Sequence, residues 1–240
     1  MHKNYSIFTI FLSSLLIVIS PPAYAHKLIL TDDANVNYEN VLEIPDHKIS
    51  WAIYENLDAG EAKFYSFNAK KGDSFYASIV IPKLDYLINY KPSIGIFSKS
   101  LELENKFEQF SQFNFPDNVN GIMYKYDGPL PSTEFYEPFG QVTYWERQKI
   151  DITLPNNGVY YLVVFNNEPT PGKYSLAVGK IEQFSALEIF TLIPISWLET
   201  KLFFEDYLSI LIAILILIAI PALVCLSIFR KKRKIQSAKL

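Results

Sequence analysis

The chain has 240 residues, of which 50% are hydrophobic, and it carries a formal net charge of −3. All 25 acidic residues but only 15 of the 22 basic residues lie between positions 26 and 206, so this segment has a formal charge of −10. Such a segment repels nucleic acid and anionic lipid, which argues against a nucleic-acid-binding protein and favours cations or basic partners. The single cysteine, Cys225, excludes an intramolecular disulfide, so the domain depends on its hydrophobic core.

Residues 1–25 have the layout of a secretory signal peptide. An apolar run of 13 residues, 7–19, is followed by the small-residue pattern Ala-Tyr-Ala, which ends at Ala25. The run is short for crossing a bilayer, and the pattern is typical of a cleavage site. We therefore predict cleavage after Ala25 and a mature chain that begins at His26. An uncleaved anchor is the alternative.

Residues 26–181 alternate between short strand-like segments and turn residues. We expect seven or eight strands and no helix among them, with candidates at 51–56, 61–69, 74–81, 93–98, 122–126, 149–154, 159–165 and 173–180. Strands without helices between them favour a mainly β fold. We predict an antiparallel β-sandwich of the jelly-roll-like type, and a closed barrel is the alternative.

Two turns predict β-hairpins. The sequences Lys-Lys-Gly-Asp at 70–73 and Pro-Asn-Asn-Gly at 155–158 each separate two strand candidates. Glycine in such turns supplies the positive φ angles that a tight hairpin needs. Both predicted hairpins run from a strand through the turn to an aromatic pair, so they echo each other, and a remnant duplication is one explanation.

The late strand candidates resemble a known family. Two patterns, G-x-Y-Y-x-x-V and G-x-Y-x-L-x-V, fall at Gly158, Tyr160, Tyr161 and Val164, and at Gly172, Tyr174, Leu176 and Val178. With the earlier strand that leads into a Gly-Asp turn, they are similar to the pre-peptidase C-terminal type of β-sandwich. The resemblance covers about residues 50–180, although 99–148 do not match. It implies an accessory domain without catalysis of its own, and here no protease domain accompanies it.

Residues 182–206 are expected to form a helical stalk. The sequence Ser-Ala-Leu-Glu from Ser185 has capping-box form and predicts a short helix that ends before Pro194. A second such signal begins at Ser196. Helix-forming residues then continue without interruption, so we expect one helix from about Trp197 to Phe229.

Residues 207–229 form an uncharged apolar stretch, followed at once by the basic block 230–234. A helix of this length reaches about 35 Å and can cross a hydrocarbon core of about 30 Å. The basic flank predicts that the tail, 230–240, lies in the cytoplasm and the preceding chain outside. We therefore predict a single-pass type I protein of the cell membrane that contacts the lipid bilayer.

A copper site is the sharpest metal hypothesis. Cleavage after Ala25 would free the α-amine of His26, which could chelate Cu²⁺ together with Nδ1 of the same residue. His47, the other histidine of the mature chain, would complete a histidine brace. The two histidines are far apart in the sequence, so an ordinary terminal residue and a surface turn at His47 are the alternative.

A calcium loop is the second metal hypothesis. Asp33, Asn35 and Asn37 place oxygen ligands at alternate positions. An EF-hand loop needs Gly at its sixth position and Glu at its twelfth, where this chain has Tyr38 and Ile44. An EF-hand is therefore excluded, and an irregular calcium site or a solvated loop remains.

An aromatic segment from Phe135 to Trp145 lies among glutamates and offers a surface for stacking sugars or capturing a basic peptide. Packing onto the sandwich is the favoured alternative.

Enzyme motifs such as G-x-S-x-G, H-E-x-x-H and the P-loop are missing, so we predict no catalytic residue and no cofactor. The predicted function is a membrane-anchored binding or structural domain outside the cytoplasm, serving as an accessory subunit of a membrane or envelope complex. Its partner is expected to be a protein or a surface glycan. Copper binding or delivery by His26 and His47 is the alternative function.

Overall fold

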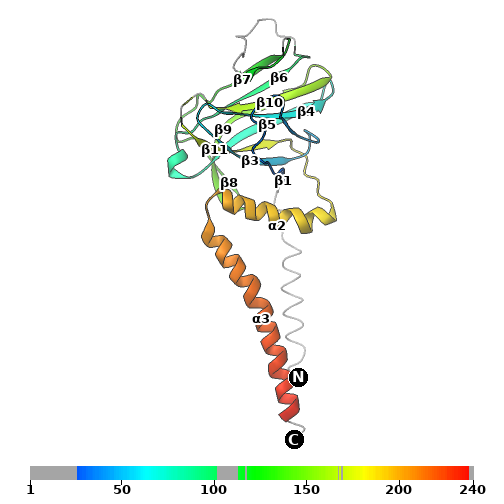
Figure 1. Ribbon diagram of the computed structural model, residues 1–240, viewed down its shortest axis with the longest axis vertical. Coiled ribbons are helices and arrows are strands. Elements are labelled where there is room, and N and C mark those ends of the chain that lie inside the picture. Colours follow the sequence, from blue (N-terminus) through cyan, green and yellow to red (C-terminus); the bar gives the residue numbers. More distant parts are fainter. Residues whose placement is uncertain (1–25, 102–112, 117, 167, 169, 238–240) are drawn as a thin grey trace. The chain divides into compact units, whose positions relative to one another are not determined.

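The computed structural model describes residues 26–101, 113–116, 118–166, 168 and 170–237 (Figure 1). The predicted signal peptide, 1–25, lies outside the described residues. The chain divides into two compact units, Met1–Ile193 and Pro194–Leu240, and each is described by itself.

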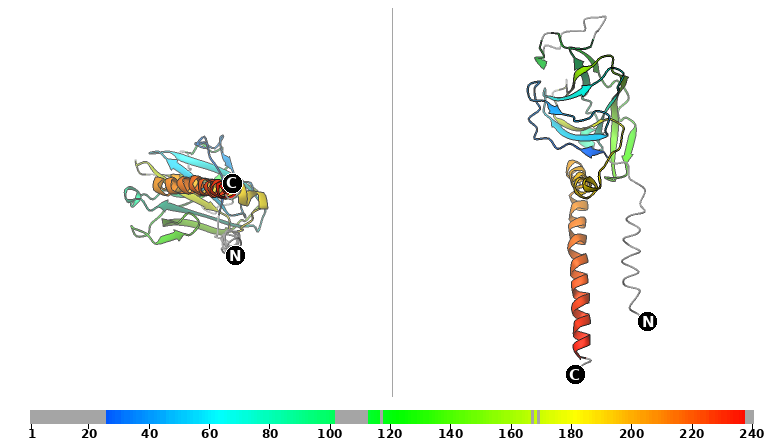
Figure 2. Two further views of the ribbon diagram at one scale, coloured as in Figure 1. Left: turned by 90° about the horizontal axis from the view of Figure 1, so that it is seen from below. Right: turned by 90° about the vertical axis from the view of Figure 1, so that its right-hand side faces the viewer.

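The first unit is a sandwich of two β-sheets, which appear as two layers in Figure 2. The six-stranded sheet has the order β1 (Lys27–Leu28), β3 (Trp51–Leu57), β11 (Gly172–Val178), β5 (Ser74–Pro82), β9 (Val142–Thr153) and β8 (Glu134–Glu137). The five-stranded sheet has the order β2 (Leu42–Glu43), β4 (Ala62–Ala69), β10 (Gly158–Phe165), β6 (Ser93–Ser98) and β7 (Asn120–Tyr124). A 3₁₀ turn, η1 (Asp85–Leu87), lies between β5 and β6.

The strand order confirms the predicted jelly-roll-like sandwich. From β3 to β6 successive strands alternate between the sheets, and β9, β10 and β11 return to lie between the earlier ones. The short edge strands β1 and β2 pair in parallel with β3 and β4, and the other pairings are antiparallel. Each sheet has two edge strands, so the alternative of a closed barrel, which has no edge strands, is wrong.

The two predicted hairpins are wrong, because each turn crosses from one sheet to the other. The turn at 70–73 joins β4 to β5, and the turn at 155–158 joins β9 to β10. The two similar segments pair with each other instead, β4 with β10 and β5 with β9. Gly72 has a φ of +88° at the first corner, and its amide donates to the carbonyl of Leu154 at the second (2.9 Å). The turn therefore needs glycine, as predicted, but the glycine serves a corner between the two sheets and not a hairpin.

Aromatic side chains fill the space between the sheets. Phe67 of β4 stacks on Phe75 of β5 at 4.6 Å between ring centroids, and Tyr160 of β10 also stacks with Phe67, at 5.6 Å. A second cluster, which includes Phe64, Phe97, Phe113, Val163 and Phe165, packs separately from this core. Side chains alternate along a strand, so Phe64 and Tyr65 of β4 belong to different clusters.

The helix α2 (Ala186–Phe203) begins at the predicted capping box. The Ser185 amide donates to the Glu188 carboxylate (2.7 Å), and the Glu188 amide donates to the Ser185 hydroxyl (3.3 Å). The prediction that this helix ends before Pro194 is wrong, since α2 continues through that residue. Ser196 is consequently an interior position and starts no helix.

The predicted continuous helix from Trp197 to Phe229 is also wrong. α2 ends at Phe203, and three residues separate it from α3 (Tyr207–Ser237). Glu205 has a φ of +60°, its amide donates to the carbonyl of Leu202 (3.0 Å), and the Asp206 amide donates to the carbonyl of Lys201 (2.9 Å). This pair of bonds is a Schellman motif, which ends a helix. The Asp206 carboxylate then accepts from the Ser209 amide (3.2 Å) and caps α3.

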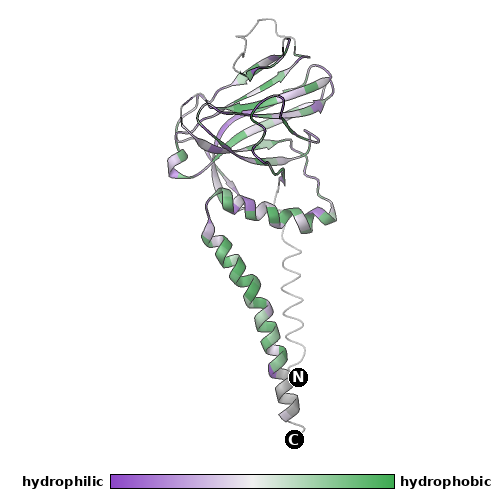
Figure 3. Ribbon diagram, viewed as in Figure 1, coloured by the Kyte–Doolittle hydropathy of each residue, from purple (hydrophilic) through white to green (hydrophobic). Residues whose placement is uncertain are grey.

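α3 contains the predicted membrane-crossing segment. Among the described residues, Tyr207–Arg230 is the one helical stretch that is long and apolar enough to cross a bilayer. None of the residues in its most apolar part is buried within the protein. Figure 3 shows the hydrophobic colouring along most of this helix.

Candidate functional site

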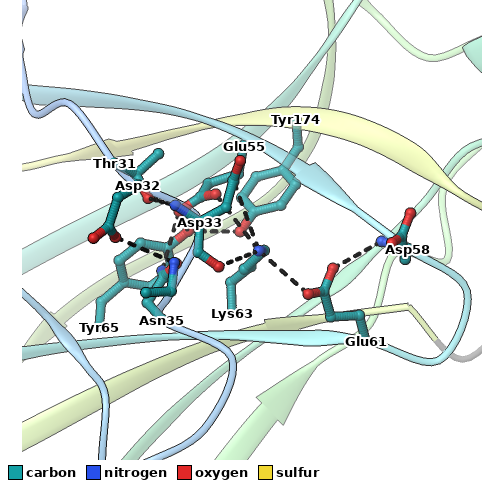
Figure 4. A network of polar contacts seen from close by, with 11 residues as sticks. Thr31, Asp32, Asp33, Asn35, Glu55, Asp58, Glu61, Lys63, Tyr65 and Tyr174 are labelled. Atoms are coloured by element: carbon teal, nitrogen blue, oxygen red, sulfur yellow. Dashed lines mark hydrogen bonds and ion pairs between the residues drawn. The ribbon is translucent and has the colours of Figure 1, made fainter.

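Charged and polar side chains meet inside the sandwich, where a hydrophobic core is expected. Glu55 of β3 and Lys63 of β4 are only 1% and 2% exposed, and Tyr65 and Tyr174 beside them are fully buried (Figure 4). Buried charges are costly unless they are paired, so this group of residues is the strongest candidate for a specific role in the first unit. We call it the Glu55 network.

Two hydrogen bonds hold the Glu55 carboxylate. Its Oε1 accepts from Nδ2 of Asn35 (3.0 Å) and from the hydroxyl of Tyr65 (3.3 Å). The hydroxyl groups of Tyr65 and Tyr174 share a further hydrogen bond of 2.6 Å. The other carboxylate oxygen of Glu55, Oε2, has no hydrogen-bond partner among the described residues and lies 4.0 Å from Nζ of Lys63.

Lys63 faces three carboxylates. Its Nζ lies 3.3 Å from Glu61, 3.7 Å from Asp33 and 4.0 Å from Glu55, and Figure 4 shows these contacts as dashed lines. The loop that carries Asp33 is tied to β4, because the Phe64 amide donates to the carbonyl of Asn35 (2.8 Å). Lys63 therefore occupies the position where a bound cation would balance the carboxylates.

Burial dominates the electrostatics of this network. Burial raises the pKa of Glu55 and the neighbouring Asp33 adds to the rise, while Asn35 and Lys63 lower it, and the net result is a pKa of about 7. Burial also raises the pKa of Tyr65 and of Tyr174 well above the usual value, so both hydroxyls stay protonated at neutral pH. Glu55 is consequently a buried group of this network whose charge changes near neutral pH.

A carboxyl group with a pKa near 7 suits general acid–base chemistry, but proton transfer requires contact with a substrate. The side chain of Glu55 has no exposed surface, and that of Lys63 is 3% exposed. A substrate therefore has no access to either group in this structure. The network is better suited to joining the two sheets than to catalysis.

The two histidines of the copper hypothesis have different partners. Nδ1 of His26 contacts the hydroxyl of Ser50 (2.5 Å). His47 lies in the predicted turn, where Asp46 and Lys48 are exposed, but its own side chain is buried and packs on Phe67 with Nε2 3.6 Å from Asp73. Burial lowers the pKa of both histidines. The copper brace stays a prediction, to be tested by metal analysis of the purified mature chain with a His47→Ala control.

The predicted calcium ligands point to different partners. Asn35 is buried and bonds Glu55, whereas the Asn37 side-chain oxygen accepts from the amides of Glu39 and Asn40 (3.0 Å each). Asp33 faces Lys63. Across the described residues, no group of three or more His, Cys, Asp or Glu side chains is arranged to hold a metal ion.

The aromatic segment from Phe135 to Trp145 divides into two parts. Trp145 of β9 is 3% exposed and packs in the core between the sheets. Tyr144 is also 3% exposed and stacks on Phe135 at 6.5 Å between ring centroids. Phe135 and Tyr136 lie on the edge strand β8 and are exposed. Packing therefore explains Tyr144 and Trp145, whereas Phe135 and Tyr136 remain available as a surface.

Lys27 links the edge of the sandwich to the start of α2. Its Nζ lies 2.7 Å from the Glu188 carboxylate and within 6 Å of the ring centroids of Trp51 and Phe184. Together with the Ser185 amide, this contact lowers the pKa of Glu188 to about 2. The first turn of α2 is thereby tied to β1.

The sequence did not lead to the Glu55 network, although one signal was present. Ile53, Glu55 and Leu57 share one face of β3, and that face is buried. A charged residue in an otherwise apolar inward series indicates a buried polar group. Its partners Asn35 and Tyr174 lie far away in the sequence and only the fold brings them together.

No protein-family model and no curated protein matches the chain. Similar solved structures include the Aeromonas hydrophila protein PliG, a periplasmic inhibitor of g-type lysozyme (14% identity, 65% of this chain and 98% of that chain covered, TM-score 0.35). Another is the pre-peptidase C-terminal domain of a Bacillus anthracis collagenase (14% identity, 57% and 92% covered, TM-score 0.32), the domain type that the sequence resembles. A third is the Yersinia pseudotuberculosis-derived mitogen (11% identity, 60% and 93% covered, TM-score 0.32). At these TM-scores the similarities carry no argument about function.

Proposed function

We propose that this chain is a single-pass membrane protein that displays a non-catalytic jelly-roll domain outside the cytoplasm. It serves there as a binding or supporting subunit of a membrane or envelope complex, with a protein or a surface glycan as partner. The observation that carries the proposal is the apolar helix Tyr207–Arg230, whose leucine and isoleucine side chains are exposed along its whole length. Each apolar Å² left in water costs about 25 cal/mol, so such a helix is stable only in lipid.

The orientation follows from charge. Arg230 ends the apolar stretch and begins a block of five basic residues in the sequence, whereas residues 26–206 carry a formal charge of −10. Basic residues are retained on the cytoplasmic side of a span. The acidic domain is then on the outer side, where it repels anionic surfaces and attracts basic ones.

Cysteine labelling in intact cells tests the membrane topology. In a Cys225→Ser background, Val159→Cys places a thiol on the exposed surface of the sandwich, and Ser237→Cys places one beyond the span. A membrane-impermeant maleimide is expected to label the first in intact cells and the second only after permeabilisation. Labelling of position 237 in intact cells would overturn the orientation.

The signal peptide and the partner need separate measurements. Amino-terminal sequencing of the purified chain is expected to start at His26, and a start at Met1 would show an uncleaved anchor. Crosslinking in native membranes, followed by co-purification, is expected to recover a stoichiometric partner. Recovery of the chain alone under conditions that preserve other envelope complexes would contradict the accessory-subunit role.

A further inference from the structure

The exposed side chains of the helix α2 are mainly apolar, whereas some of its polar side chains are buried. Leu187 and Phe190 are 72% and 80% exposed, and further along the same helix Ile195, Leu198 and Leu202 are exposed as well. Ser196 and Thr200, in contrast, are buried. Figure 3 shows hydrophobic residues along α2. A helix at the surface of a soluble protein has the opposite arrangement.

The spacing of these side chains places them on one face. Leu187, Ile195, Leu198 and Leu202 are separated by eight, three and four residues, which the period of 3.6 residues brings to the same side of a helix. Ser196 and Thr200 are four residues apart and lie on the opposite side. Thr191 also lies on this exposed face, and its hydroxyl donates to the carbonyl of Leu187 within the helix (3.0 Å). An exposed, mainly apolar face of this kind marks a contact with another apolar phase.

The connection to α3 identifies that phase. Only Phe204, Glu205 and Asp206 separate the end of α2 from Tyr207, the first residue of the apolar span. Four Cα steps extend at most roughly 14 Å, which keeps the end of α2 near the headgroups wherever α3 enters the bilayer. Lipid is therefore within reach of the apolar face without any further partner.

The connection is also built as a fixed corner. Glu205 ends α2 with a positive φ, Asp206 caps α3, and the Asp206 carboxylate pairs with Nζ of Lys201 at 2.8 Å. Hydrogen bonds of Lys201 and Ser209 to Asp206 lower its pKa to about 2, so the charge persists at physiological pH. Charged residues at this corner prevent α2 from entering the hydrocarbon as an extension of α3.

We infer that α2 lies along the outer surface of the bilayer that α3 crosses, with Leu187, Phe190 and Leu198 in contact with the acyl chains. This inference rests on the membrane anchoring proposed above. Such interfacial helices bind lipid through their buried apolar area. Lys27 of β1 pairs with Glu188 in the first turn of α2. The proposed contact is apolar, so it does not depend on the charge of the headgroups.

Fluorescence quenching by lipid tests the inference on the full chain. Three variants in a Cys225→Ser background, Leu198→Cys on α2, Leu215→Cys in the span and Val159→Cys on the sandwich, are labelled with the fluorophore NBD and reconstituted into phosphatidylcholine vesicles. Replacing the lipid by its acyl-brominated form is expected to quench the labels at 198 and 215 strongly and to leave the label at 159 unchanged. The emission of the label at 198 is also expected to shift to shorter wavelength relative to that at 159.

The three labels separate the failure of this inference from failure of the anchoring. Quenching at 215 without quenching at 198 would overturn the inference and leave the anchor intact. Absence of quenching at 215 would refute the anchoring itself. A blue-shifted label at 198 that brominated lipid does not quench would show a protein or a second copy of the chain on α2, and would equally overturn the contact with lipid.

Discussion

Replacing Glu55 by glutamine is expected to remove a large part of the pH dependence of the stability of the sandwich. The carbonyl oxygen of glutamine can still accept from Asn35 and Tyr65, as Oε1 of Glu55 does. Lys63 keeps Glu61 at 3.3 Å and Asp33 at 3.7 Å, so it is not left without a carboxylate. The substitution therefore removes a titratable group with little change in shape or pairing.

The direction and the size of this pH effect on the free energy of unfolding follow from the linkage between proton binding and folding. The pKa of Glu55 is about 7 in the folded chain against an ordinary value of 4.5, so the folded state binds this proton more tightly than the unfolded state does. The stability that the protonated group provides is present below pH 4.5 and is lost as the pH rises through 7. At 1.36 kcal/mol per pKa unit, the loss amounts to about 3 kcal/mol. Glutamine resembles the protonated form and keeps that stability at every pH.

Urea unfolding of the detergent-solubilised full chain, followed by near-ultraviolet circular dichroism between pH 5 and 8, measures this effect. The Glu55→Gln variant is expected to exceed the wild type in free energy of unfolding at pH 8 by about 3 kcal/mol and to approach it at pH 5. Glu146→Gln, at an exposed position of β9, is the matched control and should follow the wild-type curve. Parallel curves for Glu55→Gln and wild type, or a less stable variant at pH 8, would refute the reasoning. Pairing with Lys63 would then outweigh burial.

Three further substitutions probe other parts of the structure by the same unfolding measurement. Lys63→Met leaves Glu55 without its cation and is expected to cost about 3–5 kcal/mol at pH 8 and less at pH 5; an equal cost at both pH values would contradict this. Trp145→Ala should cost about 3–5 kcal/mol, whereas Trp145→Phe should cost little because Nε1 has no hydrogen-bond partner among the described residues. A stable alanine variant that loses ligand binding would instead make Trp145 a surface residue. Gly72→Ala places a side chain at a φ of +88° and should cost about 1–2 kcal/mol, while a neutral effect would show that the corner relaxes.

Several features were predictable because they depend on local chemistry. The capping box at Ser185 and the apolar stretch of α3 both lie where the sequence indicated. The short strand candidates without helices among them also predicted a β-sandwich, which the jelly-roll order confirms. Each of these signals is contained within one helix or strand.

The errors concern what happens beyond one element. A glycine turn such as that at Gly72 is compatible with a hairpin and with a corner between sheets, and the choice depends on which distant strands complete the ladders. The break between α2 and α3 escaped detection because Glu205, not glycine, adopts the left-handed conformation there. Glutamate is otherwise a good helix former, so its propensity indicated a continuous helix.

The sequence by itself determined the class of this protein: a β-rich acidic domain followed by a helix apolar enough to cross a membrane. These properties follow from composition and periodicity, which depend only on residues that are close together in the chain. Only the tertiary structure decided that β4 pairs with β10, that Glu55 meets Asn35 and Tyr174, and that α2 turns its apolar face outward. Each of these depends on contacts between residues far apart in the chain, and local propensity does not encode which of many compatible contacts buries the most apolar surface.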